Sequence, residues 1–261
     1  MSTATSDQPL LQTTNLCKFY GGVKALRGAT ITVGHGEHIA IMGDNGAGKS
    51  TFAKILSGAQ AASEGTIVFD GEERTFNAPI DSRNAGIETV YQDLSLADDL
   101  DVLSNLFLGR EEMYFKLGGL SVLNRRKMGR RATELLSEIG VNVPEVHRTV
   151  KGLSGGQRQG IAIARASGWG SKLIIMDEPT AALGLQETGH VHDIIRNLKA
   201  KGVAVIIVSH NMQQVLELTD RVYVFRRGEV VGSRTTKDTS ADEIVSLITG
   251  AQAPDGAKQY A

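Results

Sequence analysis

The segment GDNGAGKST, at residues 43–51, has the composition of a phosphate-binding loop. It follows the apolar run HIAIM and precedes a helix-like pattern, so its N–H groups and the positive end of a helix dipole would point at one spot. In the pattern G-x-x-x-x-G-K-[ST], the lysine reaches the outer phosphates and the hydroxyl ligates magnesium. Such a pattern arises by chance in roughly one chain in a hundred of this length, so a plain glycine turn is the alternative. The expected phosphate-binding residues are Gly43, Asp44, Asn45, Gly46, Ala47, Gly48, Lys49, Ser50 and Thr51.

Two adjacent carboxylates end the apolar run LIIMDE at residues 173–178. A carboxylate at the tip of a strand beside a phosphate loop is where magnesium would be held. We therefore expect Asp177 and Ser50 to ligate Mg²⁺, and Glu178 to orient or deprotonate an attacking water. Taken alone, an Asp-Glu pair is usually a solvated strand end, and it is the preceding phosphate loop that favours the functional interpretation.

A third motif, LSGGQ, occupies residues 153–157 and precedes the helix-like stretch RQGIAIARA. Ser154 has the right type and place to cap that helix, and Gly155 and Gly156 allow a backbone to approach a phosphate closely. From average composition, this pentapeptide should occur by chance in well under about one chain in a thousand.

The three motifs, with DEPT at 177–180, occur in an order that resembles the ATP-binding cassette ATPases over residues 10–250. The resemblance implies that the chain binds and hydrolyses ATP with Mg²⁺ and works as a head-to-tail pair of two copies. In that pair, each ATP would lie between the phosphate loop of one copy and LSGGQ of the other. The nucleotide-contacting residues of this second motif would be Ser154, Gly155, Gly156 and Gln157.

The same resemblance suggests roles for three single residues. Gln92 would sense magnesium and the transmembrane partner. The catalytic residues would then be Glu178, His210 and Gln92. The metal ligands would be Ser50, Gln92 and Asp177. His210 would contact the γ-phosphate. Tyr20 would stack on adenine, although a tyrosine packed in the core at a strand end is an equal competitor.

Other residues of chemical interest receive a structural interpretation. Trp169 is expected to be a packing residue, and the single Cys17 to be a small residue in a strand of a reducing compartment. One position departs from the family: after DEPT the usual S-x-L-D is replaced by AALG, so Gly184 stands where a carboxylate is common. This departure affects the loop that links the two nucleotide sites. The histidines expected to be structural are His35, His38, His147, His190 and His192.

Within the family, the segment at 88–111 and the AALG sequence are similar to the ATPases of bacterial monosaccharide importers of the ribose, xylose and fructose type. That likeness implies uptake of a monosaccharide or related polyol, with a membrane permease and an extracytoplasmic solute-binding protein as partners. The chain would then work peripherally at the cytoplasmic face of the bacterial inner membrane. The alternatives are import of an amino acid or lipid, a soluble cassette protein acting on the ribosome or DNA, and a small-molecule kinase.

Composition argues against nucleic acid as a partner. The chain has 28 basic and 29 acidic residues, a net charge of −1, and therefore no long-range positive field. No secretory signal is visible, and the longest apolar runs, such as VAVIIV at 203–208, are far shorter than the ~20 residues of a membrane-spanning helix.

The alternation of strand and helix patterns predicts an α/β fold: a P-loop NTPase core with a mostly parallel sheet. Runs without polar alternation, such as HIAIM and LIIMD, suit parallel strands buried on both faces.

Antiparallel strands near both chain ends, including a hairpin at 221–234, are expected to form a side sheet. Residues 94–165 are expected to form an all-helical insertion, the stretch 121–141 being the clearest helix, and a helix at 240–250 should open with a Ser240/Glu243 capping box. Residues 1–9 and 251–261 are expected to be tails.

Overall fold

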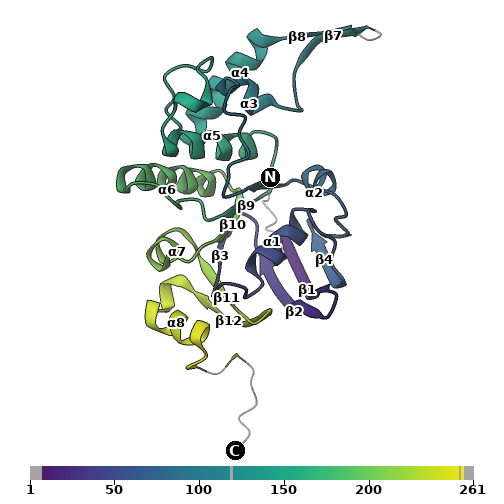
Figure 1. The fold of residues 1–261 in the computed structure, drawn as a ribbon, viewed down its shortest axis with the longest axis vertical. Coiled ribbons are helices and arrows are strands. Elements are labelled where there is room, and N and C mark those ends of the chain that lie inside the picture. Colours follow the sequence, from purple (N-terminus) through teal and green to yellow (C-terminus); the bar gives the residue numbers. More distant parts are fainter. Residues whose placement is uncertain (1–7, 118–119, 253, 256–261) are drawn as a thin grey trace, which may run out of the picture. The chain divides into compact units, whose positions relative to one another are not determined.

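The computed structural model describes residues 8–117, 120–252 and 254–255. The expected tails therefore lie largely outside the described residues. The chain divides into two compact units, which are taken separately below (Figure 1). The first comprises residues 1–89, 171–178 and 199–261, and the second comprises residues 90–170 and 179–198. Within the described part of the chain, no helix has both the length and the apolar character needed to cross a membrane.

The first unit is built on a sheet with strand order β12-β11-β3-β10-β9-β6. β3 pairs in parallel with β10 and β11, and β10 pairs in parallel with β9. In β3, Ile39 and Ile41 belong to one core cluster, whereas Ala40 and Met42 belong to another. The strand is thus buried on both faces, as its lack of polar alternation predicts. The strands are β3 (His38–Gly43), β6 (Ile87–Val90), β9 (Leu173–Asp177), β10 (Ala204–Val208), β11 (Arg221–Arg226) and β12 (Glu229–Thr235).

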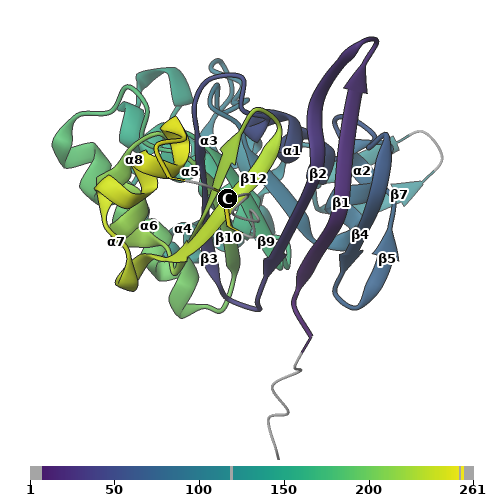
Figure 2. The same ribbon diagram turned by 90° about the horizontal axis from the view of Figure 1, so that it is seen from below.

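An antiparallel sheet of order β2-β1-β4-β5 forms the side sheet, visible as neighbouring strands in Figure 2. Its strands are β1 (Leu11–Tyr20), β2 (Val23–Val33), β4 (Glu64–Phe69) and β5 (Glu72–Arg74). The C-terminal hairpin forms as predicted, with Gly228 in its turn at φ 88°, but the expectation that it joins the side sheet is wrong. Its strand β11 pairs in parallel with β3, because the apolar residues of β11 are buried on both faces of the main sheet.

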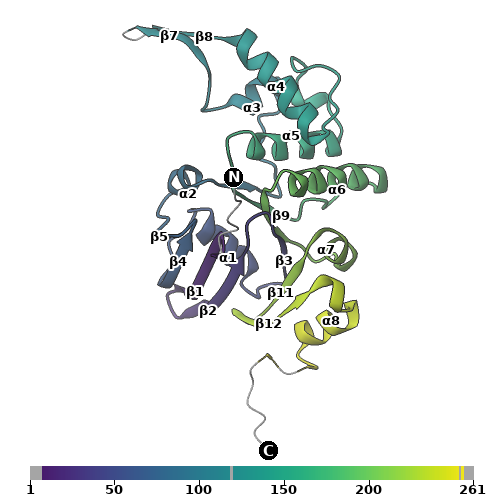
Figure 3. The ribbon, with the colours of Figure 1, turned by 180° about the vertical axis from the view of Figure 1, so that it is seen from behind.

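The helices of the first unit are α1 (Lys49–Leu56), α2 (Pro79–Ala85), α7 (Met212–Leu218) and α8 (Ala241–Thr249), with a 3-10 turn at Thr236–Asp238. α7 and α8 lie beside β11 and β12 (Figure 3), where Val215 and Leu247 share a core cluster with Val224. α8 ends at Gly250 as predicted, and Ser240 Oγ accepts the Glu243 N–H at 3.3 Å. Only this half of the capping box is found, because the Glu243 carboxylate accepts hydrogen bonds from Arg234 and Thr239.

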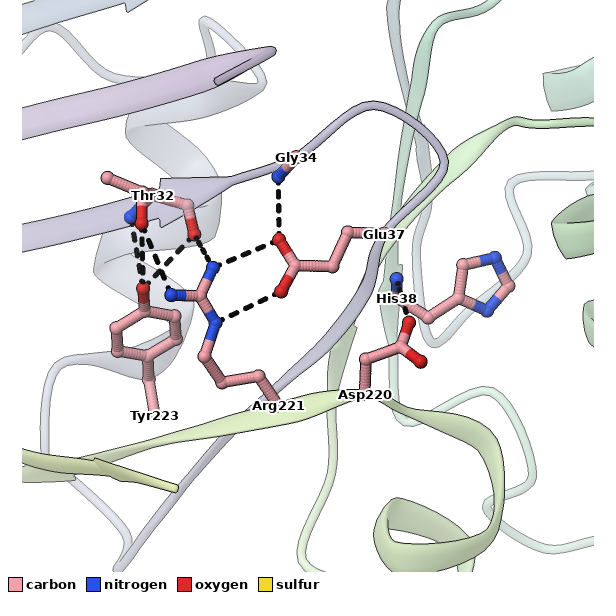
Figure 4. A network of polar contacts seen from close by, with 7 residues as sticks. All are labelled: Thr32, Gly34, Glu37, His38, Asp220, Arg221 and Tyr223. Atoms are coloured by element: carbon pink, nitrogen blue, oxygen red, sulfur yellow. Dashed lines mark hydrogen bonds and ion pairs between the residues drawn. The ribbon is translucent and has the colours of Figure 1, made fainter. Parts of the chain in front are cut away.

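A polar network ties the side sheet to the main sheet (Figure 4). The Arg221 guanidinium of β11 donates to both carboxylate oxygens of Glu37, at 3.0 and 2.9 Å, and to the Thr32 carbonyl of β2 at 2.9 Å. The Tyr223 hydroxyl donates to the same carbonyl at 3.1 Å. Next to it, Asp220 accepts the backbone N–H of His38 at 3.0 Å. These contacts join β2 of the side sheet to β11 of the main sheet and hold the start of β3, the strand that leads into the glycine-rich loop.

The second unit contains α3 (Val102–Phe107), α4 (Arg125–Ile139), α5 (Gly155–Ser167) and most of α6 (Leu185–Ala200), with a 3-10 turn at Val150–Gly152. The expectation of an all-helical insertion is wrong in one respect. An antiparallel hairpin of β7 (Met113–Leu117) and β8 (Leu120–Leu123) precedes α4. Residues 121–123 are too few for their periodicity to distinguish strand from helix, and the helix begins only after Asn124, whose side chain accepts the Lys127 N–H.

Candidate functional site

The loop between β3 and α1 has a backbone that only glycine can form at two of its positions. Gly43 has φ 151°, and a Cβ there would lie 2.2 Å from the Phe225 carbonyl oxygen. Gly48 has φ 104°, and a Cβ there would lie 2.9 Å from the Ala25 carbonyl oxygen. The loop is thus fitted closely between β2 and β11 and opens directly into the first turn of α1. This is the geometry that points backbone N–H groups at an anion.

The Lys49 side chain curls back over this loop. Its ammonium donates to the carbonyl oxygens of Gly43 at 2.8 Å and Asp44 at 3.0 Å. Burial lowers the pKa of Lys49, and the charges of Glu178, Asp44 and Asp177, in that order, oppose this shift. The ammonium therefore lies in the loop, where the charges of both Asp177 and Glu178, at the end of β9, raise its pKa. Asp44, Asn45, Gly46 and Ser50 are exposed along the loop, Thr51 is half-buried, and Ala47 and Gly48 are buried.

Asp177 and Glu178 sit at the carboxyl end of β9, beside β10. Asp177 pairs with Val208, whose carbonyl also accepts the Glu178 N–H at 2.9 Å. Burial raises the pKa of Asp177, the Glu178 charge adds to the rise, and Lys49 opposes it. Glu178 has φ 49°, a left-handed backbone that is strained for a residue with a side chain and is found mainly where function requires it.

The structure also brings His210 to this place. Its Nδ1 lies 2.7 Å from Glu178 Oε1. The side chain of Glu178 is 17% exposed and that of His210 is 77% exposed. One ring nitrogen of His210 thus holds the carboxylate, while most of the ring faces solvent. Lys49, Asp177, Glu178 and His210 all belong to the first unit, where three separate segments of the chain supply them.

The residues present fit a magnesium ion bound together with a nucleotide. Magnesium is usually held by one or two carboxylates plus substrate phosphates and water, rather than by a complete protein cage. Asp177 supplies one carboxylate and the exposed Ser50 one hydroxyl. No group of three or more His, Cys, Asp or Glu side chains among the described residues could hold a metal by itself, so phosphate oxygens would have to complete the shell.

Tyr20, at the end of β1, is not a core residue. Its side chain is 44% exposed, so the alternative of a buried strand-end tyrosine is wrong. The hydroxyl bonds to the Gln60 side chain, and the Lys18 ammonium lies 5.4 Å from the ring centroid. An exposed, anchored ring is available for stacking.

The LSGGQ segment lies in the second unit and begins α5. Ser154 is the N-cap: its Oγ accepts the Gln157 N–H at 3.3 Å, and Gln157 Oε1 accepts the Ser154 N–H at 3.1 Å. This cap is predicted from the sequence. Glu187 is not, and its carboxylate accepts the Gly156 N–H at 3.3 Å and the Gly184 N–H at 3.3 Å. The available signal was its position three residues after Gly184 at the start of α6, which is the Glu position of a capping box.

Three further residues singled out in the sequence are Gln92, His38 and Trp169. Gln92 is exposed and belongs to the second unit, so its role stays a prediction. His38 is fully buried, and Trp169 packs edge-on against Phe107, with ring centroids 5.2 Å apart, in contact with the guanidinium of Arg131. These contacts agree with structural roles for both.

Comparisons with known proteins identify the family of this chain. The family model described as ABC transporter matches residues 26–181. The chain is 43% identical over 240 residues to a xylose/arabinose import ATP-binding protein of Sulfolobus acidocaldarius, covering 92% of this chain and 94% of that protein. It is 42% identical over 252 residues to a fructose import ATP-binding protein of Rhizobium meliloti, covering 95% of this chain and 97% of that protein. A ribose import ATP-binding protein of Yersinia pestis is 40% identical, with 93% of this chain matching 46% of that longer protein.

Solved structures agree with the fold. An ATP-binding cassette of an ABC transporter in its ADP conformation is 28% identical, with a TM-score of 0.74 over 93% of this chain and 95% of that one. A dimeric cassette in a post-hydrolysis state, bound to ADP and Pi, is 25% identical, with a TM-score of 0.71 over 88% of this chain and all of that one. With the phosphate loop, the carboxylate pair and the capped LSGGQ helix in place, the chain belongs to the ABC transporter family and is an ATPase cassette of that family.

Proposed function

We propose that this ATPase energises the uptake of a monosaccharide or related polyol in a bacterium, through a separate membrane permease. The observation that carries the hydrolytic part is the Glu178–His210 contact of 2.7 Å beside Lys49 and Asp177. It holds the Glu178 carboxylate in a fixed place next to the loop that would bind phosphate. The sugar part rests on the two relatives of matching length, which are a xylose/arabinose import ATP-binding protein and a fructose import ATP-binding protein.

The first unit can perform the chemistry by positioning and charge. The loop N–H groups and the Lys49 ammonium would bind the β- and γ-phosphates. Asp177 and Ser50 would hold Mg²⁺, which neutralises charge on the phosphates when it is bound. Glu178 would orient the attacking water and accept its proton, while His210 fixes the carboxylate and presents the rest of its ring to the γ-phosphate.

The working form would be a head-to-tail pair of two copies. Two cassettes of similar structure are dimeric, which supports a pair as the working form. In it, Ser154, Gly155, Gly156 and Gln157 of one copy would contact the ATP bound to the other. ATP would favour the closed pair and hydrolysis would release it, so that nucleotide turnover drives the permease between states.

The partners would be integral membrane permease subunits, with Gln92 at their contact, and, indirectly, an extracytoplasmic solute-binding protein. The chain would then act peripherally at the cytoplasmic face of the bacterial inner membrane. The solute is selected by those other subunits, so amino-acid or lipid import by the same ATPase is the competing assignment. Purifying the native complex and identifying the ligand of its solute-binding protein decides between them.

The Glu178→Gln variant tests the hydrolytic assignment. The amide is nearly isosteric but can neither accept a proton nor carry charge, so ATP should bind while turnover stops. On a sizing column with ATP and Mg²⁺, this variant should accumulate as a dimer. Lys49→Ala should stay monomeric, because the cation that balances the outer phosphates is gone. Hydrolysis by Glu178→Gln at the parent rate would show that Glu178 is not the catalytic carboxylate.

A second substitution tests the head-to-tail arrangement. In the Glu178→Gln background, Gly155→Asp should abolish the dimer, because its carboxylate would face the γ-phosphate bound to the other copy. A Cβ at Gly155 would lie 2.9 Å from Leu183 Cδ2, so Gly155→Ala is the control that adds the same atom without charge. If the ATP-bound dimer survives Gly155→Asp, this pairing of the copies is wrong.

A further inference from the structure

We infer that the Glu187 carboxylate competes with an ATP phosphate for the Gly156 N–H of the LSGGQ segment. This carboxylate must therefore leave the Gly156 N–H before the ATP-bound dimer can close. The inference rests on the proposed head-to-tail function. It adds a residue outside the known motifs, and it assigns to that residue control over the ATP concentration at which two copies join.

The contacts of Glu187 carry the first step. One carboxylate oxygen accepts the Gly156 N–H at 3.3 Å, and the other accepts the Gly184 N–H at 3.3 Å. Gly156 is the second residue of α5, and the neighbouring Gln157 N–H is already taken by Ser154 Oγ. Hydrogen bonds from Gly156, Gly184 and Ser154 lower the pKa of Glu187, so the carboxylate is charged at neutral pH. The exposed start of the LSGGQ helix is thus satisfied by an anion of the same chain.

The fit between the two segments is tight. A Cβ at Gly156 would lie 3.0 Å from Glu187 Cβ, and one at Gly155 would lie 3.6 Å from Glu187 Oε2. The glycine at 156 therefore allows α6 to bring its carboxylate against the backbone of α5. All of these residues belong to the second unit.

A nucleotide phosphate from the other copy would need the same donor. One N–H cannot serve a carboxylate and a phosphate at full strength, and two anions at contact distance repel each other. Glu187 can give up the Gly156 N–H while it keeps the Gly184 N–H, because a different oxygen makes each bond. The release thus leaves the Gly184 hydrogen bond at the start of α6 in place.

The test is a titration of ATP-driven dimerisation in the Glu178→Gln background. Glu187→Gln keeps an oxygen for the Gly184 N–H but removes the charge. With Mg²⁺ present, the ATP concentration that gives half-maximal dimer should fall about fivefold, the effect of removing one repulsion between unit charges near 4 Å in water. The control is Asp193→Asn, which removes the same charge from α6 at an exposed residue that pairs with Arg196.

Each outcome is decisive. A lower midpoint for Glu187→Gln with an unchanged midpoint for Asp193→Asn supports the inference, since loss of a purely structural contact would raise the midpoint. An unchanged or higher midpoint for Glu187→Gln, with a native circular-dichroism spectrum, overturns the inference and leaves the proposed function intact. Failure of the Glu178→Gln parent to dimerise at any ATP concentration overturns the proposed function, and the inference with it.

Discussion

The Glu178 carboxylate lies 2.7 Å from His210 Nδ1, although 32 positions separate the two residues in the sequence. β9 and β10 are parallel neighbours, with Asp177 opposite Val208, so their carboxyl ends bring the two side chains together. The left-handed backbone of Glu178 turns the chain at this point, and the Val208 carbonyl accepts its N–H. The carboxylate proposed to be catalytic is thus held by a histidine that is itself mostly exposed.

His210→Ala should lower the rate of ATP hydrolysis by about a hundredfold or more while ATP still binds. The change removes both the hold on Glu178 and the expected contact with the γ-phosphate. Phosphate release measures the rate, and calorimetry measures the affinity. His190→Ala, at an exposed histidine of α6, is the control and should leave both unchanged. Equal rates for His210→Ala and the parent would contradict the role.

Tyr20→Ala should weaken ATP binding by about 1–3 kcal/mol, the range found for bases stacked on aromatic side chains. The exposed ring supports this expectation. Tyr20→Phe keeps the ring and loses only the hydrogen bond to Gln60, so it should bind nearly as well as the parent. Calorimetric affinities that do not change in Tyr20→Ala would remove this residue from the nucleotide site.

Asp177→Asn should raise the Mg²⁺ concentration needed for half-maximal hydrolysis by at least about tenfold, because a neutral amide is a weaker ligand for a hard cation. ATP binding without metal should persist, since Lys49 and the loop are untouched. The check is a Mg²⁺ titration of phosphate release. A curve identical to that of the parent would place the metal on other ligands.

Gly184→Asp restores the carboxylate that the family usually has, and should keep ATP hydrolysis while changing its cooperativity in the assembled transporter. The position has room for a side chain: within the described part of the chain, the atom that comes within 4 Å of a Cβ there is Glu187 Oε2, at 4.0 Å. Gly184→Asn separates the effect of charge from that of bulk. Identical Hill coefficients in reconstituted vesicles would show that the missing carboxylate has no effect here.

His38 should make the free energy of unfolding depend on pH. Burial, with a smaller effect of Lys199, lowers its pKa from 6.5 to about 4. Between these values the unfolded chain binds a proton that the folded chain does not. The stabilising contribution is therefore complete above about pH 6.5 and is lost as the pH falls toward 4.

Urea unfolding should accordingly give a free energy about 2 kcal/mol lower at pH 5 than at pH 7. In His38→Gln this difference should largely disappear, whatever the variant's absolute stability. A pH dependence that the substitution leaves unchanged would assign it to other groups.

The sequence by itself determined the motifs and the elements that carry them. GDNGAGKST, LSGGQ and DEPT are local patterns, and the apolar runs that lead into the first and the last of them are the buried strands β3 and β9. The helix caps at Ser154 and Gly250 were also predictable, because each depends on residues within one turn.

Tertiary structure alone decided the features that depend on residues distant in the sequence. The pairing of β11 with β3, rather than with the side sheet, follows from burial of both of its faces. The contact of His210 with Glu178 and that of Glu187 with Gly156 join segments 32 and 31 positions apart. Residue types fix local backbone preferences within a few positions. Contacts between distant segments form only when packing brings buried strands and helices side by side, and therefore no local sequence pattern predicts them.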